Sequence, residues 1–375
     1  MSFRIPLFTT SFGPEEEEAV LGVLRSAWLT MGDRVRELEE RFSGELEGVH
    51  ALAVTNCTAG LHLAYEGLGI GAGDEVIVPS ITFVATANTV QAAGATPVFA
   101  DITSLQDPSI DPDDVERRIT SRTKAICVVH FAGFPCDMDR INAIARRHNL
   151  AVVEDCAHAL FSTLGGRRLG TLGTISAFSF FSNKNITCGE GGVVATADPE
   201  LAKACALRRS HGMTTLTLDR HRGRAISYDV PCAGHNYRMD EIRAALSLAQ
   251  LDRLPGYLAA RRELRAQYLA ALSDIRGLIA PDFGRRSDDV GIHIMPILLP
   301  GEADRVAVIQ GVRERGIQTS IHYPAIHTFS GYAGFAGRLE RSEEFASREL
   351  TLPFYPGMSA EDVQYVATAL REVLP

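Results

Sequence analysis

Short apolar runs alternate with helical patterns along the first two thirds of the chain. The apolar runs are rich in Val, Ile and Ala, which is typical of strands buried on both faces of a sheet. We expect these strands at residues 51–55, 75–78, 97–101, 125–131, 151–155, 175–180 and 192–196. Helices are expected between them at about 58–68, 83–93, 111–119 and 137–148. The alternation predicts an α/β fold with a mostly parallel seven-stranded sheet flanked by helices.

The pattern changes after about residue 198, where helical periodicity dominates. Helices are expected at 199–210, 239–252 and 257–273, and the aperiodic segment 211–236 is expected to be a long functional loop. Strands near 292–298 and 317–321 and a terminal helix near 359–373 indicate a smaller α+β unit. We therefore expect a large domain over residues 1–250, with an N-terminal helical segment, and a small C-terminal domain over residues 251–375.

Composition and charge narrow the classes of partner. The 375 residues carry a formal net charge of −9, so the chain lacks the basic footprint that a nucleic acid needs. No apolar run reaches the roughly 20 residues that span a bilayer. The acidic N-terminal stretch is unlike a signal peptide. We expect no membrane partner and a cytoplasmic location. The seven scattered cysteines form no CxxC pair, which fits reduced thiols and predicts no metal site.

Lysine is rare in this chain, so each lysine is a candidate for a specific role. Among 37 basic residues, only Lys124, Lys184 and Lys203 are lysines. Solvent-exposed roles account for Lys124, at a strand entry, and for Lys203, on an amphipathic helix. Lys184 lies in FSFFSNKNITCGEGG, a turn at a strand end, where catalytic groups usually sit. A surface lysine is an equally open alternative for Lys184 at this point.

Three further strand ends carry candidate chemistry. Asp155 ends a buried strand in VVEDCAH, where it caps a helix, joins a salt bridge or pairs with a protonated pyridine nitrogen. Thr58 and Ala59 begin a helix in TNCTAG, where free N–H groups either bind phosphate or are capped locally. Phe83 in PSITFVATAN either stacks on a flat ring or joins the core. Because ligands gather at the carboxyl ends of parallel strands, all four connections are expected to converge on one site.

The ordered motifs are similar to those of a known family. Nearly the whole chain resembles the DegT/StrS-type sugar aminotransferases, which are fold-type I enzymes dependent on pyridoxal phosphate (PLP), within the aspartate aminotransferase superfamily. The motifs that carry the resemblance include GDEVIVPSITFVATANTV, VVEDCAHA, FSFFSNKNITCGEGGVV, HNYRMDEIRAALSLAQL and HYPAIH. A dehydratase branch of this family has histidine at the position of Lys184, so the lysine favours transamination.

The resemblance implies a role for each matching residue. Lys184 would form a Schiff base with pyridoxal 5′-phosphate, Asp155 would pair with the ring nitrogen, and Phe83 would lie against the ring. The phosphate would be bound by Thr58, Ala59 and Ser179, together with Asn236 of a neighbouring subunit, which implies a homodimer with shared active sites. His158 replaces the Gln or Glu of many relatives and would bond the phenolic oxygen or lie against the ring. Tyr323 and His327 would lie near the substrate. Arg222, in the loop 211–225, would bind a substrate diphosphate or remain solvated.

The resemblance also implies the reaction. An amino acid, expected to be glutamate, would donate its amino group to a keto-sugar, expected to be a nucleotide-linked keto-deoxysugar. The mechanism would be ping-pong, through pyridoxamine 5′-phosphate (PMP). Alternatives are a keto-cyclitol or another non-nucleotide ketone of secondary metabolism as acceptor, or a non-catalytic PLP-binding regulatory relative. A nicotinamide-dependent enzyme would need GxGxxG after the first strand, and TNCTAG lacks that spacing.

Overall fold

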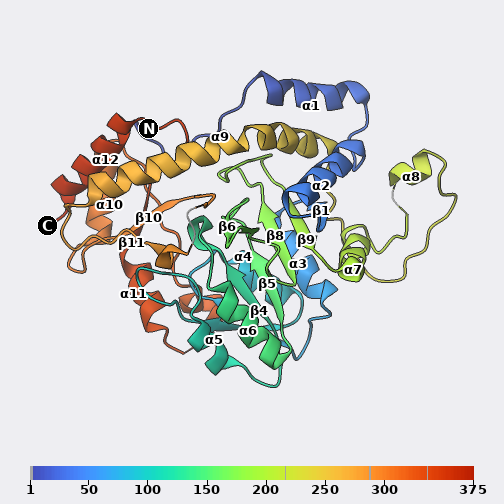
Figure 1. Ribbon diagram of the computed structural model, residues 1–375, viewed down its shortest axis with the longest axis horizontal. Helices are drawn as coiled ribbons and strands as arrows, with labels where there is room; N and C mark the ends of the chain where they lie inside the picture. Colours follow the sequence, from blue (N-terminus) through green and yellow to red (C-terminus); the bar gives the residue numbers. More distant parts are fainter. Residues whose placement is uncertain (1–2, 216, 287–288, 336) are drawn as a thin grey trace.

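A seven-stranded sheet forms the centre of the computed structural model, which describes residues 3–215, 217–286, 289–335 and 337–375 (Figure 1). Its strands, in spatial order, are β1 (His50–Val54), β9 (Gly192–Thr196), β8 (Ile175–Ser179), β5 (Ala151–Asp155), β4 (Thr123–Val129), β2 (Glu75–Pro79) and β3 (Thr96–Ala100). Strand β9 runs antiparallel to β1 and β8, whereas the other neighbouring pairs are parallel. The predicted fold class is therefore confirmed.

The apolar runs are continuous because both faces of the sheet are covered. In β2, Val76 and Val78 join one buried cluster while Ile77 joins another, on the opposite face. The covering helices are α3 (Cys57–Gly67), α4 (Ala85–Ala92), α5 (Pro112–Arg118), α6 (Met138–His148) and α7 (Pro199–Arg209). Side chains of Asn56 and Asp137 accept backbone N–H groups at the starts of α3 and α6, which explains where these helices begin.

One long helix replaces the two helices predicted after residue 239. Helix α9 (Glu241–Leu272) is continuous through Pro255, so the predicted break was wrong. Proline removes one internal hydrogen bond, but Leu251, Leu254 and Leu258 stay buried on both sides of it and hold the helix together. The first half of α9 packs against α1 (Pro14–Ser26) and α2 (Asp33–Glu45), and its other end packs against α12 (Ala360–Val373) (Figure 1). The predicted boundary near residue 250 falls within this helix, and the division into two domains stays a prediction.

The C-terminal part is an α+β unit whose second strand differs from the prediction. Strand β10 (Met295–Leu298) pairs with β11 (Glu349–Leu352), which the apolar pattern missed. The predicted strand at 317–321 is wrong, because this segment forms only isolated bridges through Ile317 and Ser320. The backbone N–H of His322 donates to the Glu349 carboxylate instead of to a neighbouring strand.

Short elements complete the chain. They are β6 (Thr163–Leu164), β7 (Arg167–Arg168), α8 (Thr217–His221), α10 (Arg305–Glu314), α11 (Glu340–Arg348) and the 3-10 turns Phe131–Gly133, Phe283–Arg285, Ile326–Thr328 and Ser330–Tyr332. Helix α8 interrupts the predicted loop 211–236 and stands out from the body of the molecule (Figure 1). Within the described ranges, no helix combines the length and the apolar character that crossing a bilayer requires.

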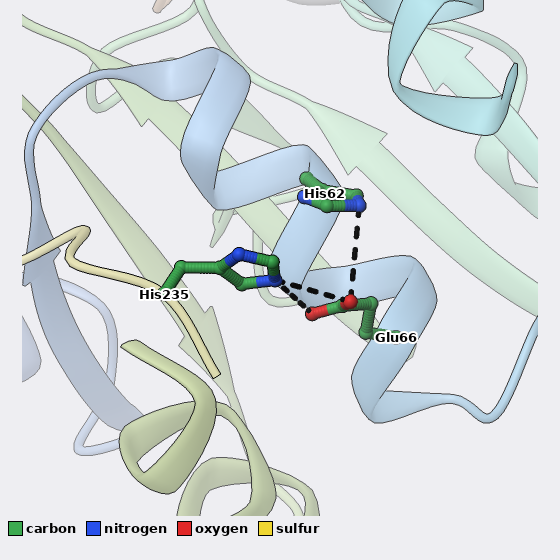
Figure 2. Close-up of side chains that lie close together, drawn as sticks. All are labelled: His62, Glu66 and His235. Atoms are coloured by element: carbon green, nitrogen blue, oxygen red, sulfur yellow. Dashed lines mark hydrogen bonds and ion pairs between the residues drawn. The ribbon is translucent and has the colours of Figure 1, made fainter. Parts of the chain in front are cut away.

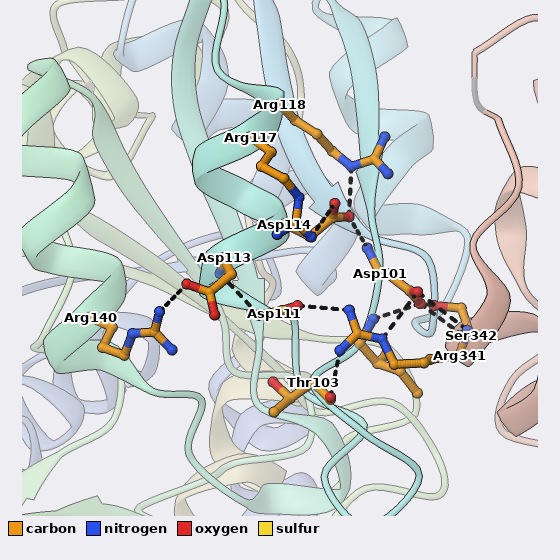
Figure 3. Close-up of polar contacts among 11 residues, drawn as sticks. Asp101, Thr103, Asp111, Asp113, Asp114, Arg117, Arg118, Arg140, Arg341 and Ser342 are labelled. Carbon is orange, nitrogen blue, oxygen red and sulfur yellow. Dashed lines mark hydrogen bonds and ion pairs between the residues drawn. The ribbon is translucent and has the colours of Figure 1, made fainter.

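A cluster of carboxylates and arginines docks α11 onto the edge of the large sheet (Figure 3). Asp101, which follows β3, accepts hydrogen bonds from the Ser342 N–H (2.8 Å) and hydroxyl (2.6 Å). Arg341 pairs with Asp101 (3.3 Å) and Asp111 (2.7 Å) and donates to the Thr103 carbonyl (2.7 Å). Burial opposes ionisation of Asp101, but the hydrogen bonds from Ser342, Ile102 and Arg341 lower its pKa overall. The C-terminal unit is thus tied to the sheet by charge as well as by apolar packing.

Replacing Arg341 with alanine is expected to lower the free energy of unfolding by about 1–2 kcal/mol, because two largely buried carboxylates lose their cation. The pKa of Asp101 is lowered in the folded state, so its contribution is present above the unfolded-state pKa and is lost as the pH falls through the lowered value. The difference between the variant and the parent should therefore shrink in acid. Urea unfolding at several pH values measures both effects. Arg338→Ala is the control, because its pairs with Glu340 and Glu343 are exposed and weak. Equal losses in the two variants would contradict the prediction.

Candidate active site

A cavity of about 380 Å³ opens at the carboxyl ends of β2, β5 and β8. Seven of the predicted site residues line it: Thr58, Phe83, Asp155, His158, Ser179, Lys184 and Tyr323. They come from separate strand ends and loops, and the sheet topology brings them to one place. The predicted convergence at this edge of the sheet is confirmed.

Lys184 is a half-buried lysine on the turn after β8, and it lines the cavity. Its backbone N–H donates to the Phe181 carbonyl (2.9 Å), and Asn185 Nδ2 donates to the Gly291 carbonyl (2.9 Å), so the turn is held on both sides. Burial lowers the pKa of Lys184 to about 8, against the opposing effect of the Asp155 charge. About a tenth of the amine is therefore neutral at pH 7, far more than for an ordinary lysine, and the neutral amine is the form that acts as a nucleophile or base. The side chain is half-buried and faces the cavity, whereas Lys203 is exposed, and the predicted role of Lys184 stays a prediction.

Asp155 ends β5 as a buried carboxylate held in a fixed orientation. Its Oδ2 accepts from the Thr86 hydroxyl (2.9 Å) and its Oδ1 from the Ala157 N–H (3.0 Å). Burial raises the pKa of Asp155, although these two hydrogen bonds and the charge of Lys184 act in the opposite direction. A carboxylate in this position can pair strongly with a protonated ligand nitrogen. Sequence reasoning missed Thr86, whose only signal is its position one helical turn after Phe83.

The start of α3 forms one wall of the cavity. Thr58 lies in its first turn, where backbone N–H groups and the helix dipole favour an anion, and Ser179 lies nearby at the end of β8. The Ala59 N–H donates to Asn56 Oδ1 (2.8 Å), so local capping accounts for this group. Ala59 does not line the cavity. Its predicted phosphate contact stays a prediction.

Aromatic and imidazole rings form the opposite wall. His158 Nδ1 accepts from the Ala132 N–H (3.2 Å), which places the ring proton on Nε2, 3.0 Å from the Tyr323 hydroxyl. Burial lowers the pKa of His158 well below its usual value, so this ring is neutral. Tyr323 therefore accepts from His158 and can donate its own proton into the cavity. Phe83 is 58% exposed at the cavity wall, where it can cover a flat ligand ring.

Besides Ala59, three predicted residues lie outside the cavity. His327 is buried between Ser80 Oγ (2.7 Å) and Glu343 Oε1 (3.3 Å), and Arg222 pairs with Asp33 (2.5 Å) at the start of α2. Their predicted substrate contacts stay predictions. Asn236 is exposed and does not line the cavity of its own chain, as a role in a neighbouring subunit would require.

His293 is a site residue that sequence reasoning missed. Its Nε2 lies 3.3 Å from Lys184 Nζ, and burial lowers the pKa of His293 well below its usual value. A neutral imidazole at this distance can accept a hydrogen bond from the lysine amine, which keeps Nζ oriented. The only sequence signal was a histidine between apolar residues in GIHIMP.

The fold and the site define an enzyme of the aminotransferase class, and comparisons with known proteins agree. Residues 11–371 match the DegT/DnrJ/EryC1/StrS aminotransferase family model, and the chain belongs to that family. It is 38% identical over 382 residues to the spore coat polysaccharide biosynthesis protein SpsC of Bacillus subtilis, covering 100% of this chain and 97% of SpsC.

Solved structures of sugar aminotransferases have the same fold. Helicobacter pylori PseC, an aminotransferase involved in the biosynthesis of pseudoaminic acid, superposes with a TM-score of 0.92 at 31% identity, covering 100% of this chain and 99% of PseC. The sugar aminotransferase CalS13 of Micromonospora echinospora gives 0.89 at 30% identity, covering 98% and 99%. Spr1654 of Streptococcus pneumoniae, solved in PLP and PMP forms, gives TM-scores of 0.89 and 0.90 at 29% identity.

Proposed function

We propose that this aminotransferase uses pyridoxal 5′-phosphate to move an amino group from glutamate to a nucleotide-linked keto-deoxysugar by a ping-pong mechanism. The observation that carries the proposal is that one cavity holds both a half-buried lysine of lowered pKa, Lys184, and the buried, oriented carboxylate of Asp155. The PLP and PMP forms of Spr1654 support both cofactor states of such a mechanism.

The residues that line the cavity fit this cofactor. Asp155 would hold the pyridine nitrogen, Phe83 would cover one ring face, and Thr58 and Ser179 would bind the phosphate. Both ring nitrogens of His158 are engaged, by Ala132 and Tyr323, which favours contact with the ring face over a bond to the phenolic oxygen. When bound, the cofactor supplies an electron sink for negative charge at the donor's α-carbon.

The chain's own residues would transfer the proton and hold the cofactor and substrate in position. Lys184 Nζ would take the proton from the donor's α-carbon as general base, and its conjugate acid would deliver that proton to the cofactor carbon C4′ instead of back to the donor. Asp155, held by Thr86 and Ala157, keeps the ring nitrogen protonated. The Tyr323 hydroxyl, oriented by His158, donates to an oxygen of the substrate or the cofactor.

The acceptor class is supported by the relatives. CalS13 is a sugar aminotransferase, PseC is an aminotransferase involved in the biosynthesis of pseudoaminic acid, and SpsC acts in spore coat polysaccharide biosynthesis. A keto-sugar is the acceptor class that a sugar aminotransferase requires, so these relatives favour it here. We also propose that the enzyme works in the cytoplasm, because all seven cysteines are unpaired and six are buried, as expected in a reducing compartment.

A homodimer with shared sites is part of the proposal. Asn236 lies outside the cavity of its own chain, and the preceding segment exposes Ile226, Tyr228 and Val230 at alternate positions. An apolar stripe of this kind is typical of a surface that is covered in an assembly.

Isotope transfer tests the reaction. Purified protein supplied with the cofactor is given ¹⁵N-amine glutamate and a panel of keto-sugar nucleotides, free keto-sugars and keto-cyclitols. Mass spectrometry should find ¹⁵N in a nucleotide-linked amino sugar and an equal amount of 2-oxoglutarate. Label only in a cyclitol would overturn the proposed acceptor, and absence of 2-oxoglutarate would indicate a non-catalytic relative.

Mixing two inactive variants tests the shared site. Lys184→Ala and Asn236→Ala chains should each have low activity, and mixed dimers should regain one intact site per dimer. Activity that stays at the level of the separate variants after exchange, with mixed dimers shown by native mass spectrometry, would contradict a shared site.

A further inference from the structure

A second group of ligand-type side chains lies outside the active-site cavity. His62 and Glu66 lie one turn apart on α3, and His235 faces them from the segment before α9 (Figure 2). His235 Nε2 lies 3.0 and 3.1 Å from the two Glu66 carboxylate oxygens, and His62 Nε2 lies 3.9 Å from Oε1. The three ligand atoms all lie within 4.8 Å of one another.

His62 carries a buried nitrogen that the protein does not satisfy. Its ring is 9% exposed, and in the described part of the chain Nε2 has no hydrogen-bond partner. Its other nitrogen, Nδ1, lies 3.1 Å from the Tyr237 hydroxyl. With the proton on Nδ1, His62 donates to Tyr237 and points the lone pair of Nε2 at the two other side chains. Metal-binding histidines have this arrangement, in which an oxygen acceptor fixes the tautomer.

The electrostatics favour a ligand of positive charge. Glu66 contributes one negative charge between two imidazoles. A hydrogen bond between Glu66 and His235 satisfies those two side chains without a metal but leaves His62 Nε2 unpaired.

The other candidate group in the described residues does not have this property. His130, Glu154 and Cys156 are fully enclosed, and the Glu154 carboxylate accepts N–H groups of Gly170, Leu172 and Gly173 as well as bonding His130. The Glu154 oxygens already have hydrogen-bond partners within the protein, so we interpret this group as a structural hydrogen-bond network.

We propose that His62, Glu66 and His235 bind a divalent transition metal of the Zn²⁺ type. Two imidazoles and one carboxylate are a set that zinc accepts, with a fourth position open to water. Zinc bonds of about 2.0–2.2 Å require these atoms to approach by about 1 Å, which rotation of the half-buried Glu66 and His235 side chains allows. The sequence predicted no metal because His235 is distant along the chain and no cysteine pair is present.

The site has a positioning role, which rests on the proposed function. Helix α3 carries Thr58 at the cavity, and His235 immediately precedes Asn236, the residue proposed to reach the neighbouring subunit. A metal between His62 and His235 fixes the Asn236 segment to the helix that begins the phosphate-binding wall. Metal binding itself is measured without turnover, so its failure and the failure of the proposed reaction are separate results.

Titration of the cofactor-loaded protein with Zn²⁺ tests the site after chelator treatment and dialysis. Calorimetry should show one ion per chain with a Kd tighter than about 1 µM. Thermal unfolding should shift upward by about 3 °C when zinc exceeds the Kd 100-fold. His235→Gln and Glu66→Gln should each weaken binding about 100-fold or more, and Tyr237→Phe by about 10- to 100-fold.

Two matched variants separate this site from adventitious binding. Cys232→Ser removes the one cysteine that is not buried, and His148→Gln removes a surface histidine paired with Glu116. Both should bind zinc as the parent does. The proposal is overturned if the parent shows no stoichiometric binding, or if binding survives His235→Gln and Glu66→Gln. Circular dichroism confirms folding, and the conservative Tyr237→Phe keeps the test decisive if another variant misfolds.

Discussion

Lys184→Ala is expected to lower turnover by about 10⁴-fold or more, because the variant loses both the covalent attachment point of the cofactor and the group that moves the proton. The amine lines the cavity and its pKa is lowered to about 8, and water in the cavity cannot reproduce a base held in place beside His293. Single-turnover measurement of 2-oxoglutarate formation, at saturating cofactor, gives the loss directly.

A second readout follows the covalent link itself. Borohydride treatment of the cofactor-loaded parent should add a stable mass to the peptide that contains Lys184, and the Ala variant should show no such addition. Lys203→Ala is the matched control, because Lys203 is exposed on α7. Lys184→Arg should be as inactive as Ala, since a guanidinium stays protonated. Turnover by Lys184→Ala near the parent rate would refute the assignment.

The sheet could be predicted because each strand is buried on both faces. Such strands appear as continuous apolar runs because neighbouring residues pack on opposite faces. In β2, for example, Val76 and Ile77 belong to different buried clusters. Strand β11 was not predicted because it begins with a glutamate, which interrupts the apolar pattern. Glu349 is nevertheless buried, and its carboxylate accepts hydrogen bonds from the His322 N–H and the Thr351 hydroxyl. The single helix α9 was not predicted because a proline such as Pro255 normally ends a helix. The packing that keeps this helix continuous involves residues distant in the sequence, which a local pattern does not show.

The site could be predicted where its chemistry is carried by unusual residues at strand ends. A lysine in an arginine-rich chain and an aspartate at the end of a buried strand are visible locally. Thr86, His293 and the tautomer of His158 depend on contacts with distant segments, namely Asp155, Lys184 and Ala132. Such partners are set by the topology of the fold, so no local pattern identifies them.

Asp155→Asn is expected to lower kcat by about 10²–10⁴-fold with little change in KM. An amide carries no negative charge and cannot keep a pyridine nitrogen protonated, so the electron sink is weakened while the cavity keeps its shape. The Thr86 hydroxyl and the Ala157 N–H now hold the carboxylate and would still contact a side chain of nearly the same size. Steady-state kinetics, together with the pH dependence of the bound cofactor's absorbance, measure both consequences.

Thr86→Val provides the graded comparison, because it removes one hydrogen bond to Asp155 and leaves the charge in place. Loss of one such bond corresponds to about a 10-fold effect on kcat. Asp155→Asn should therefore lower kcat more than Thr86→Val does, and only Asp155→Asn should move the absorbance titration strongly. A loss of stability without a change in that titration would mean that Asp155 is a structural carboxylate, and the charge pairing with the ring nitrogen would have to be abandoned.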